Sequence, residues 1–88
     1  MAIVDIFIYI KDGYKYRFVA TGDNSQYFQF VSPTDQAVDI PVSVIKDIGT
    51  KQKDLPKYIQ VKYICMVYKI SMSFAIKIYE FAIERYLA

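Results

Sequence analysis

The amino-acid sequence predicts an α+β protein, in which an antiparallel β-meander of four to five strands precedes a C-terminal amphipathic helix packed on one face of the sheet. Three observations support this fold class. Isoleucine, valine, tyrosine and phenylalanine dominate the apolar residues, whereas leucine occurs only at Leu55 and Leu87, and β-branched and aromatic side chains favour pleated sheets. Apolar and polar residues alternate from Ala2 to Lys11. The segment from Ser71 to Ala88 contains neither glycine nor proline, which favours a helix that Ser71 can cap.

The first turn, Lys11–Gly13, decides which side chains of the first strand and of the second strand, 14–21, face each other. A two-residue loop would set Lys15 and Arg17 opposite isoleucines and mix charge into an apolar face. A three-residue loop, with Gly13 in the left-handed conformation, keeps that face apolar, so we expect this register. It pairs Ile10 with Tyr14, Ile8 with Tyr16 and Ile6 with Phe18.

A turn over 22–25 precedes a third strand over 26–32. A further turn over 32–35 separates that strand from a short fourth strand over 37–40. Together these segments make the β-meander, which spans residues 2–40. Because side chains alternate between the two faces of a sheet, the register also predicts which of them point toward the core. The expected inner face consists of Val4, Ile6, Ile8, Ile10, Tyr14, Tyr16, Phe18, Phe28 and Phe30.

The segment between the meander and the C-terminal helix is the most ambiguous part of the chain. Residues 41–49 fit a short helix or turn that begins with Pro41 and ends at Gly49, although a strand continued through Val44 is the alternative. Residues 50–57 are polar and predict an exposed loop. Residues 58–70 alternate like a strand, and their tyrosine, isoleucine and valine content favours that prediction over a helix, so we expect a strand there and a helix over 71–88.

Length and composition favour a single domain over residues 1–88 and exclude several classes of protein. Cys65 is the only cysteine, so no intrachain disulfide can form and the reducing cytoplasm is the expected location. Met1 to Ile10 lacks the basic start of a signal peptide, and charged residues interrupt every apolar stretch that could span a membrane. The low count of thermolabile residues, one Asn and no His, leaves a thermophilic source open.

No pattern of residues indicates catalysis or metal binding. The absence of histidine removes the commonest general base and metal ligand. Cys65 lies in an apolar run that favours a buried thiol over a nucleophile. Glu80 and Glu84 are one helical turn apart, but a solvated polar stripe beside Lys77 explains them without a metal. We therefore expect no enzymatic activity, no cofactor, no metal and no small-molecule substrate.

The C-terminal helix carries more apolar surface than one contact with a sheet requires. Its apolar arc covers roughly 240°, whereas packing on one sheet needs a little over about 100°. The sequence therefore predicts a non-enzymatic protein-interaction module that forms a homodimer, or an inhibitor or adaptor that acts on a larger protein. Two flanks of the helix are candidates for the contact: Phe74, Ile78, Phe81 and Arg85 on one side, or Ile76, Tyr79, Ile83 and Tyr86 on the other.

A nucleic-acid-binding protein is the alternative function. In the expected register Phe7 lies opposite Arg17 and Tyr9 opposite Lys15 on the outer face of the first hairpin, and Tyr27 can extend this group from the third strand. Aromatic rings beside basic side chains can stack bases and neutralise phosphates. The same pairs can also stabilise an ordinary hairpin, and the net charge of +2 favours neither interpretation.

Overall fold

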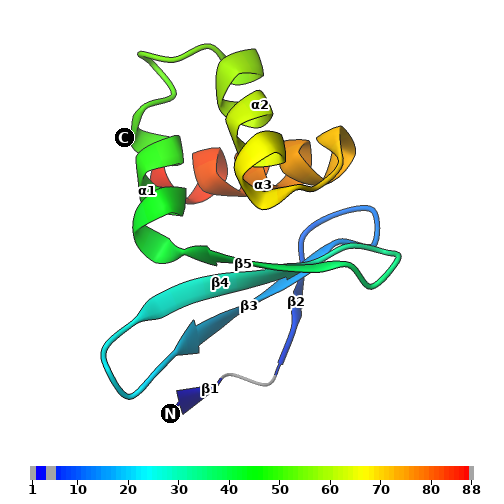
Figure 1. Ribbon diagram of the computed structural model, residues 1–88, viewed down its shortest axis with the longest axis vertical. Coiled ribbons are helices and arrows are strands. Elements are labelled where there is room, and N and C mark those ends of the chain that lie inside the picture. Colours follow the sequence, from blue (N-terminus) through cyan, green and yellow to red (C-terminus); the bar gives the residue numbers. More distant parts are fainter. Residues whose placement is uncertain (1, 4–5, 88) are drawn as a thin grey trace. The chain divides into compact units, whose positions relative to one another are not determined.

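A computed structural model describes residues 2–3 and 6–87, and in these residues the protein has the predicted α+β fold (Figure 1). An antiparallel sheet precedes a set of helices. Its strands are β1 (Ala2–Ile3), β2 (Ile8–Tyr9), β3 (Lys15–Ala20), β4 (Gln26–Val31) and β5 (Ala37–Pro41). The helices are α1 (Val42–Thr50), α2 (Lys57–Tyr68) and α3 (Met72–Tyr86). The chain divides into two compact units, Met1–Ser43 and Val44–Ala88, which are described in turn.

The sheet unit is a meander in the order β1-β3-β4-β5, with β2 also pairing with β3. The predicted three-residue turn is confirmed, because Ile8 pairs with Tyr16, and the Ile10 amide donates to the Tyr14 carbonyl at 2.8 Å. Gly13 has a φ of 87° and Asp12 a φ of 56°, and positive φ at both central residues is typical of a type I′ turn. The turn residues therefore hold the register that the alternation of apolar side chains demands.

The start of the sheet differs from the prediction. β1 pairs Ile3 with Val19, while β2 pairs Ile8 with Tyr16, so five positions of the first strand span three positions of β3. Two extra residues must be accommodated between β1 and β2, and Ile6 lies in that gap, outside both ladders. The predicted pairing of Ile6 with Phe18 was therefore wrong, because the sequence pattern carries no sign of this insertion.

The inner face of the sheet is built around an aromatic cluster. The ring of Phe28 lies 5.9 Å from those of Tyr16 and Phe18 and 6.1 Å from that of Phe30, in edge-on or tilted geometries that favour aromatic pairs. Phe28, Phe30 and Ile40 are buried, which confirms the core position predicted for the two phenylalanines. Four further predicted members are half-buried, namely Ile10, Tyr14, Tyr16 and Phe18.

Two isoleucines that were expected in the core are exposed instead. Ile6 is 72% and Ile8 50% exposed, because β2 is only two residues long and lies at the edge where the pairing is interrupted. Val4, also predicted on the inner face, lies outside the described residues.

The turn between β3 and β4 is organised by Asp23. Its carboxylate accepts hydrogen bonds from the Thr21 hydroxyl and from the Ser25 amide, the latter at 3.1 Å. The hydroxyls of Thr21 and Ser25 and the Ser25 amide hold the pKa of Asp23 at about 2, below its ordinary 3.8. A side chain that bonds to its own turn in this way explains the aspartate without a catalytic role.

The helical unit contains the clearest departure from the sequence prediction. Residues 57–68 form α2, so the predicted strand over 58–70 was wrong. Pro56 precedes the first turn, and Lys69, with a φ of 55°, ends the helix in the left-handed conformation. Nine of its twelve positions are apolar, so its pattern is compatible with a helix as well as with the predicted strand. Packing then overrides the intrinsic preference of its β-branched residues for strands.

The other two helices follow the sequence closely. α1 occupies the segment predicted as a short helix or turn, and the alternative strand through Val44 does not form. α3 begins after Ser71, whose hydroxyl accepts a hydrogen bond from the Phe74 amide at 3.2 Å, as an N-cap does. α1 ends against α3: a Cβ atom added to Gly49 would lie 2.5 Å from the Ala82 carbonyl oxygen and 2.6 Å from the Tyr86 Cβ. Only glycine permits this approach of the two helices.

We predict that Gly49→Ala lowers the free energy of unfolding by about 1–3 kcal/mol, because the added methyl group overlaps the backbone of α3. Urea denaturation followed by circular dichroism measures this change. Gly22→Ala is the matched control: a Cβ there meets nothing within 4 Å, so stability should be unchanged or raised by up to about 1 kcal/mol. Equal stability of the two variants would contradict the close packing of α1 on α3.

Candidate interaction surface

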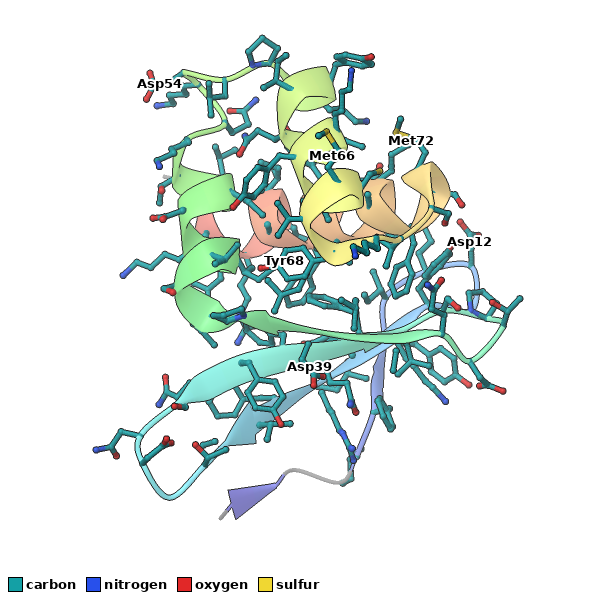
Figure 2. All side chains as sticks on the ribbon, in the orientation of Figure 1. Asp12, Asp39, Asp54, Met66, Tyr68 and Met72 are labelled. Atoms are coloured by element: carbon teal, nitrogen blue, oxygen red, sulfur yellow. The ribbon has the colours of Figure 1, made fainter. Side chains whose placement is uncertain are left out.

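The outer side of α2 is the most extensively exposed apolar element in the described residues. Tyr58, Ile59, Tyr63, Met66 and Val67 are each about half or more exposed, and Met66, which is labelled on α2 in Figure 2, reaches 69%. Ile59, Tyr63, Met66 and Val67 follow one another at steps of four, three and one, so they form one stripe along the helix. The opposite side, with Gln60, Val61 and Ile64, is buried. α2, which is apolar at nine of its twelve positions, is thus covered on one side only.

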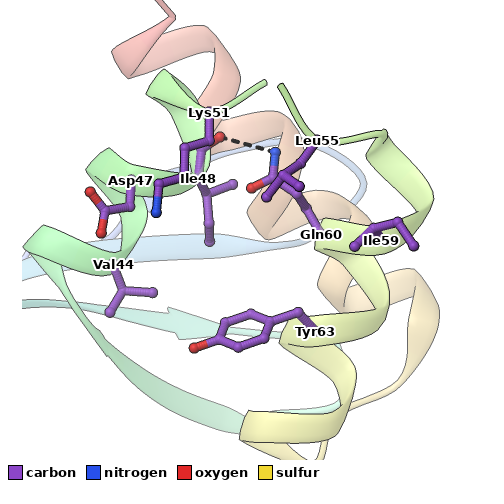
Figure 3. A pocket seen from close by; sticks show the side chains of 8 residues that line it. All are labelled: Val44, Asp47, Ile48, Lys51, Leu55, Ile59, Gln60 and Tyr63. Atoms are coloured by element: carbon purple, nitrogen blue, oxygen red, sulfur yellow. Dashed lines mark hydrogen bonds between the residues drawn. The ribbon is translucent and has the colours of Figure 1, made fainter. Parts of the chain in front are cut away.

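A groove lies beside this stripe, between α1 and α2 (Figure 3). Its volume is about 320 Å³. The apolar side chains at its walls come from both helices and from the loop between them, and Asp47 and Lys51 stand one turn apart on the α1 side. The lining residues are Val44, Asp47, Ile48, Lys51, Leu55, Ile59, Gln60 and Tyr63.

Gln60 fixes the geometry of the groove. Its side chain is buried, and its Nε2 donates to the Ile48 carbonyl at 3.3 Å (Figure 3). The last carbonyls of a helix have no intrahelical partner, and Ile48 stands in the last turn of α1. The amide of Gln60 therefore caps the end of α1 and ties it to α2. Across residues 2–3 and 6–87, no buried polar side-chain atom lacks a partner.

The two flanks of α3 that the sequence singled out are mostly used within this chain. On the first flank Phe74, Ile78 and Phe81 are buried, and only Arg85 is exposed, with its guanidinium 5.8 Å from the Phe81 ring centroid. On the second flank Tyr79 is buried and the others are half-buried, namely Ile76, Ile83 and Tyr86. Ile76 also lines a hollow of about 350 Å³ between α2 and α3, together with Lys57, Tyr58, Val61 and Met72.

The longest exposed apolar stripe among the described residues therefore lies on α2, the segment predicted to be a strand. The sequence indicated an excess of apolar residues on the C-terminal helix and did not single out α2. A helical interpretation of residues 57–68 would have shown apolar residues on most sides, which is the pattern of a helix that packs against other elements on two sides.

Positive charge gathers around this surface. Lysines occur at positions 51, 53, 57, 62 and 69, while Asp54 is the one carboxylate between Lys51 and Lys69. All five lysines are exposed. Lys62 lies beside the apolar stripe, with its ammonium 5.7 Å from the centroid of the Tyr58 ring. The whole chain has a formal charge of only +2, so this segment is more basic than the rest.

The outer face of the sheet brings together most of the residues proposed for nucleic acid. The Phe7 ring has the Lys15 ammonium 4.9 Å and the Arg17 guanidinium 4.7 Å from its centroid. Arg17 also donates from Nε to the Gln29 Oε1 at 2.8 Å. These contacts engage the Phe7 ring within the hairpin, as ordinary cross-strand pairs do.

The two tyrosines of this group are placed differently. Tyr9 lies opposite Lys15 and is 76% exposed, so it is the most accessible ring on the sheet. Tyr27 pairs with Val19 on the same face and is half-buried. The structure thus joins Phe7, Tyr9, Lys15 and Arg17 in one patch, with Tyr27 toward its far end.

The described residues offer little for chemistry. No group of three or more Cys, Asp or Glu side chains among them could hold a metal ion. Cys65 is half-buried on α2. Burial raises the pKa of Tyr68, and nearby Tyr63 adds to the effect. In the part of the chain that was searched, no single helix has the length and apolar character to cross a membrane; α2 and α3 meet that test only as a pair, bent by 118°.

Comparison with family models, with curated proteins and with solved structures finds no match to this chain.

Proposed function

We propose that this protein is a non-enzymatic protein-interaction module and that the exposed face of α2 is its contact surface. The observation that carries the proposal is the stripe of Ile59, Tyr63, Met66 and Val67, which is about half or more exposed along a helix whose other side is buried. Soluble monomers rarely leave a contiguous apolar surface uncovered unless it binds something.

The energetics support a partner at this face. Complete burial of one large apolar side chain is worth about 1.5–3 kcal/mol, so covering even part of the stripe is favourable. The groove beside it is fixed by the Gln60 hydrogen bond and is concave, which suits a single apolar anchor from the partner. Methionine at position 66 can adapt its shape to that partner.

The partner is either a second copy of this chain or a larger protein that the module inhibits or connects to another. With a single cysteine, the module suits the reducing cytoplasm, where we place it. The proposal needs no cofactor and no substrate.

A photoreactive benzoylphenylalanine at position 66 tests this function. Met66 is 69% exposed on the stripe, and Ile6, 72% exposed on the sheet unit, provides a control site of equal accessibility. In cells of the native host we expect discrete cross-linked species from position 66, visible as defined bands on a denaturing gel, and no such bands from position 6. Identical band patterns from both positions, or none from position 66, would contradict the proposed contact surface.

Nucleic-acid binding is the second candidate, and the patch of Phe7, Tyr9, Lys15 and Arg17 supports it. Because Lys15 and Arg17 already lie against the Phe7 ring, Tyr9 is the ring best placed to stack a base. If this function holds, Tyr9→Ala should cost about 1–3 kcal/mol of binding free energy, and affinity should fall steeply with added salt.

Fluorescence anisotropy with single-stranded and duplex oligonucleotides at low salt measures this binding. Ile6→Ala, an exposed change on the same unit outside the patch, should leave the affinity unchanged. Absence of binding at tens of micromolar protein would eliminate nucleic acid as the partner.

A further inference from the structure

The lysines around α2 indicate which chemical class of partner this surface favours. α2 contains Lys57 and Lys62 and no carboxylate, and Lys69 follows at its end. Lys62 and Lys69 are exposed, and Lys62 stands beside the apolar stripe, whereas Lys57 lies toward α3, with its ammonium 5.9 Å from the Tyr79 ring centroid. A partner that covers this stripe therefore meets lysines and no carboxylate on α2. Negative charge on the partner favours such a contact.

A second copy of the chain fits these lysines poorly. In a two-fold dimer the same patch meets itself, so each side chain faces its counterpart or the residue at the mirrored position. If two copies of α2 pack antiparallel about the middle of the stripe, Lys62 lies close to the partner's Lys62. A parallel arrangement instead brings every lysine near its own copy. Both arrangements oppose like charges, which disfavours association.

The shape and chemistry of the surface favour a protein segment over a membrane or a nucleic acid. The groove of about 320 Å³ between α1 and α2 is concave, and a flat lipid surface would leave it unfilled. The stripe combines Ile59, Met66 and Val67 with the single ring of Tyr63, whereas single-stranded nucleic acid stacks successive bases on several aromatic rings. Grooves of this kind take the apolar face of an amphipathic helix, with one or two side chains as anchors.

We infer that α2 binds an acidic amphipathic segment of another protein, which places a leucine- or phenylalanine-sized side chain in the groove and its carboxylates toward Lys62 and Lys69. This inference rests on the proposed function and names the partner's class. Asp47 is the one carboxylate among the groove residues, and it stands one helical turn from Lys51 on the α1 side.

A series of designed peptides tests this inference directly. Fluorescein-labelled amphipathic peptides share one leucine-rich face and differ only in the polar face, which consists of glutamate, glutamine or lysine. We expect the full-length protein to bind the glutamate peptide at least about tenfold more tightly than the glutamine peptide, and the lysine peptide more weakly still. The preference for glutamate should shrink as salt is added, because exposed charges are screened.

Two pairs of variants locate the binding. Ile59→Ser should weaken binding of the glutamate peptide by about tenfold or more, while Ile8→Ser should not, although the two side chains are 49% and 50% exposed. Lys62→Glu should reverse the preference between the glutamate and lysine peptides, and Lys11→Glu, in the exposed first turn, should leave it intact. Circular dichroism of each variant verifies that the fold is retained.

The outcomes separate this inference from the function on which it rests. If all three peptides bind equally and Ile59→Ser weakens each of them, the inference of an acidic partner is overturned and the proposed interaction module is retained. Self-association in sedimentation equilibrium that Met66→Glu abolishes would do the same, with a second copy as the partner. Tighter binding to phosphatidylserine vesicles or to single-stranded DNA than to any peptide would overturn both proposals. So would a monomer that binds none of these probes.

Discussion

The packing of the helical unit depends on the sharp bend of the chain between α2 and α3. Lys69 adopts the left-handed conformation with a φ of 55° and donates its amide to the Cys65 carbonyl, which ends α2. Two residues later the Ser71 hydroxyl accepts the Phe74 amide and starts α3. A nonglycine residue in this conformation costs about 1–2 kcal/mol, so the bend persists because the packing on both sides stabilises it. Without it, a run of apolar residues would continue as one long helix.

The bend determines which apolar side chains are covered. Because the chain bends by 118° between α2 and α3, α3 covers only one side of α2, where Val61 and Ile64 are buried. Gly49 lets α1 approach α3, and Gln60 ties the end of α1 to α2. These contacts complete the inner side of α2 and leave Ile59, Tyr63 and Met66 outside it. The exposed stripe and the groove are thus consequences of how three short helices close around one another.

Much of the sheet was predictable from local chemistry, because a slip of one residue would have reversed the faces of β2 and β3. Asp12 and Gly13 are residue types that favour a tight turn, and Ser71 is one that favours the start of a helix. The turn and the start of α3 both lie where these residues predict them. The two-residue insertion near Ile6 was not predictable, since it depends on how β1 pairs with β3 and not on the pattern of either strand. α2 was missed for a different reason. Its end is made by a lysine in a conformation that usually signals glycine, and its apolar residues fit either period. The candidate surface was therefore sought on α3, whose apolar residues Phe74 and Ile78 the chain buries itself.

We predict that the apolar stripe of α2 is open to solvent in the isolated protein. Paramagnetic relaxation of methyl resonances by a soluble nitroxide measures this accessibility most directly, at a protein concentration low enough to limit self-association. The methyl groups of Ile59 and Met66 should relax strongly, while those of Ile64 and Ile78, which are fully buried, should be protected. Protection of Ile59 and Met66 equal to that of Ile64 and Ile78 would contradict an uncovered α2 and remove the basis for the proposed contact surface.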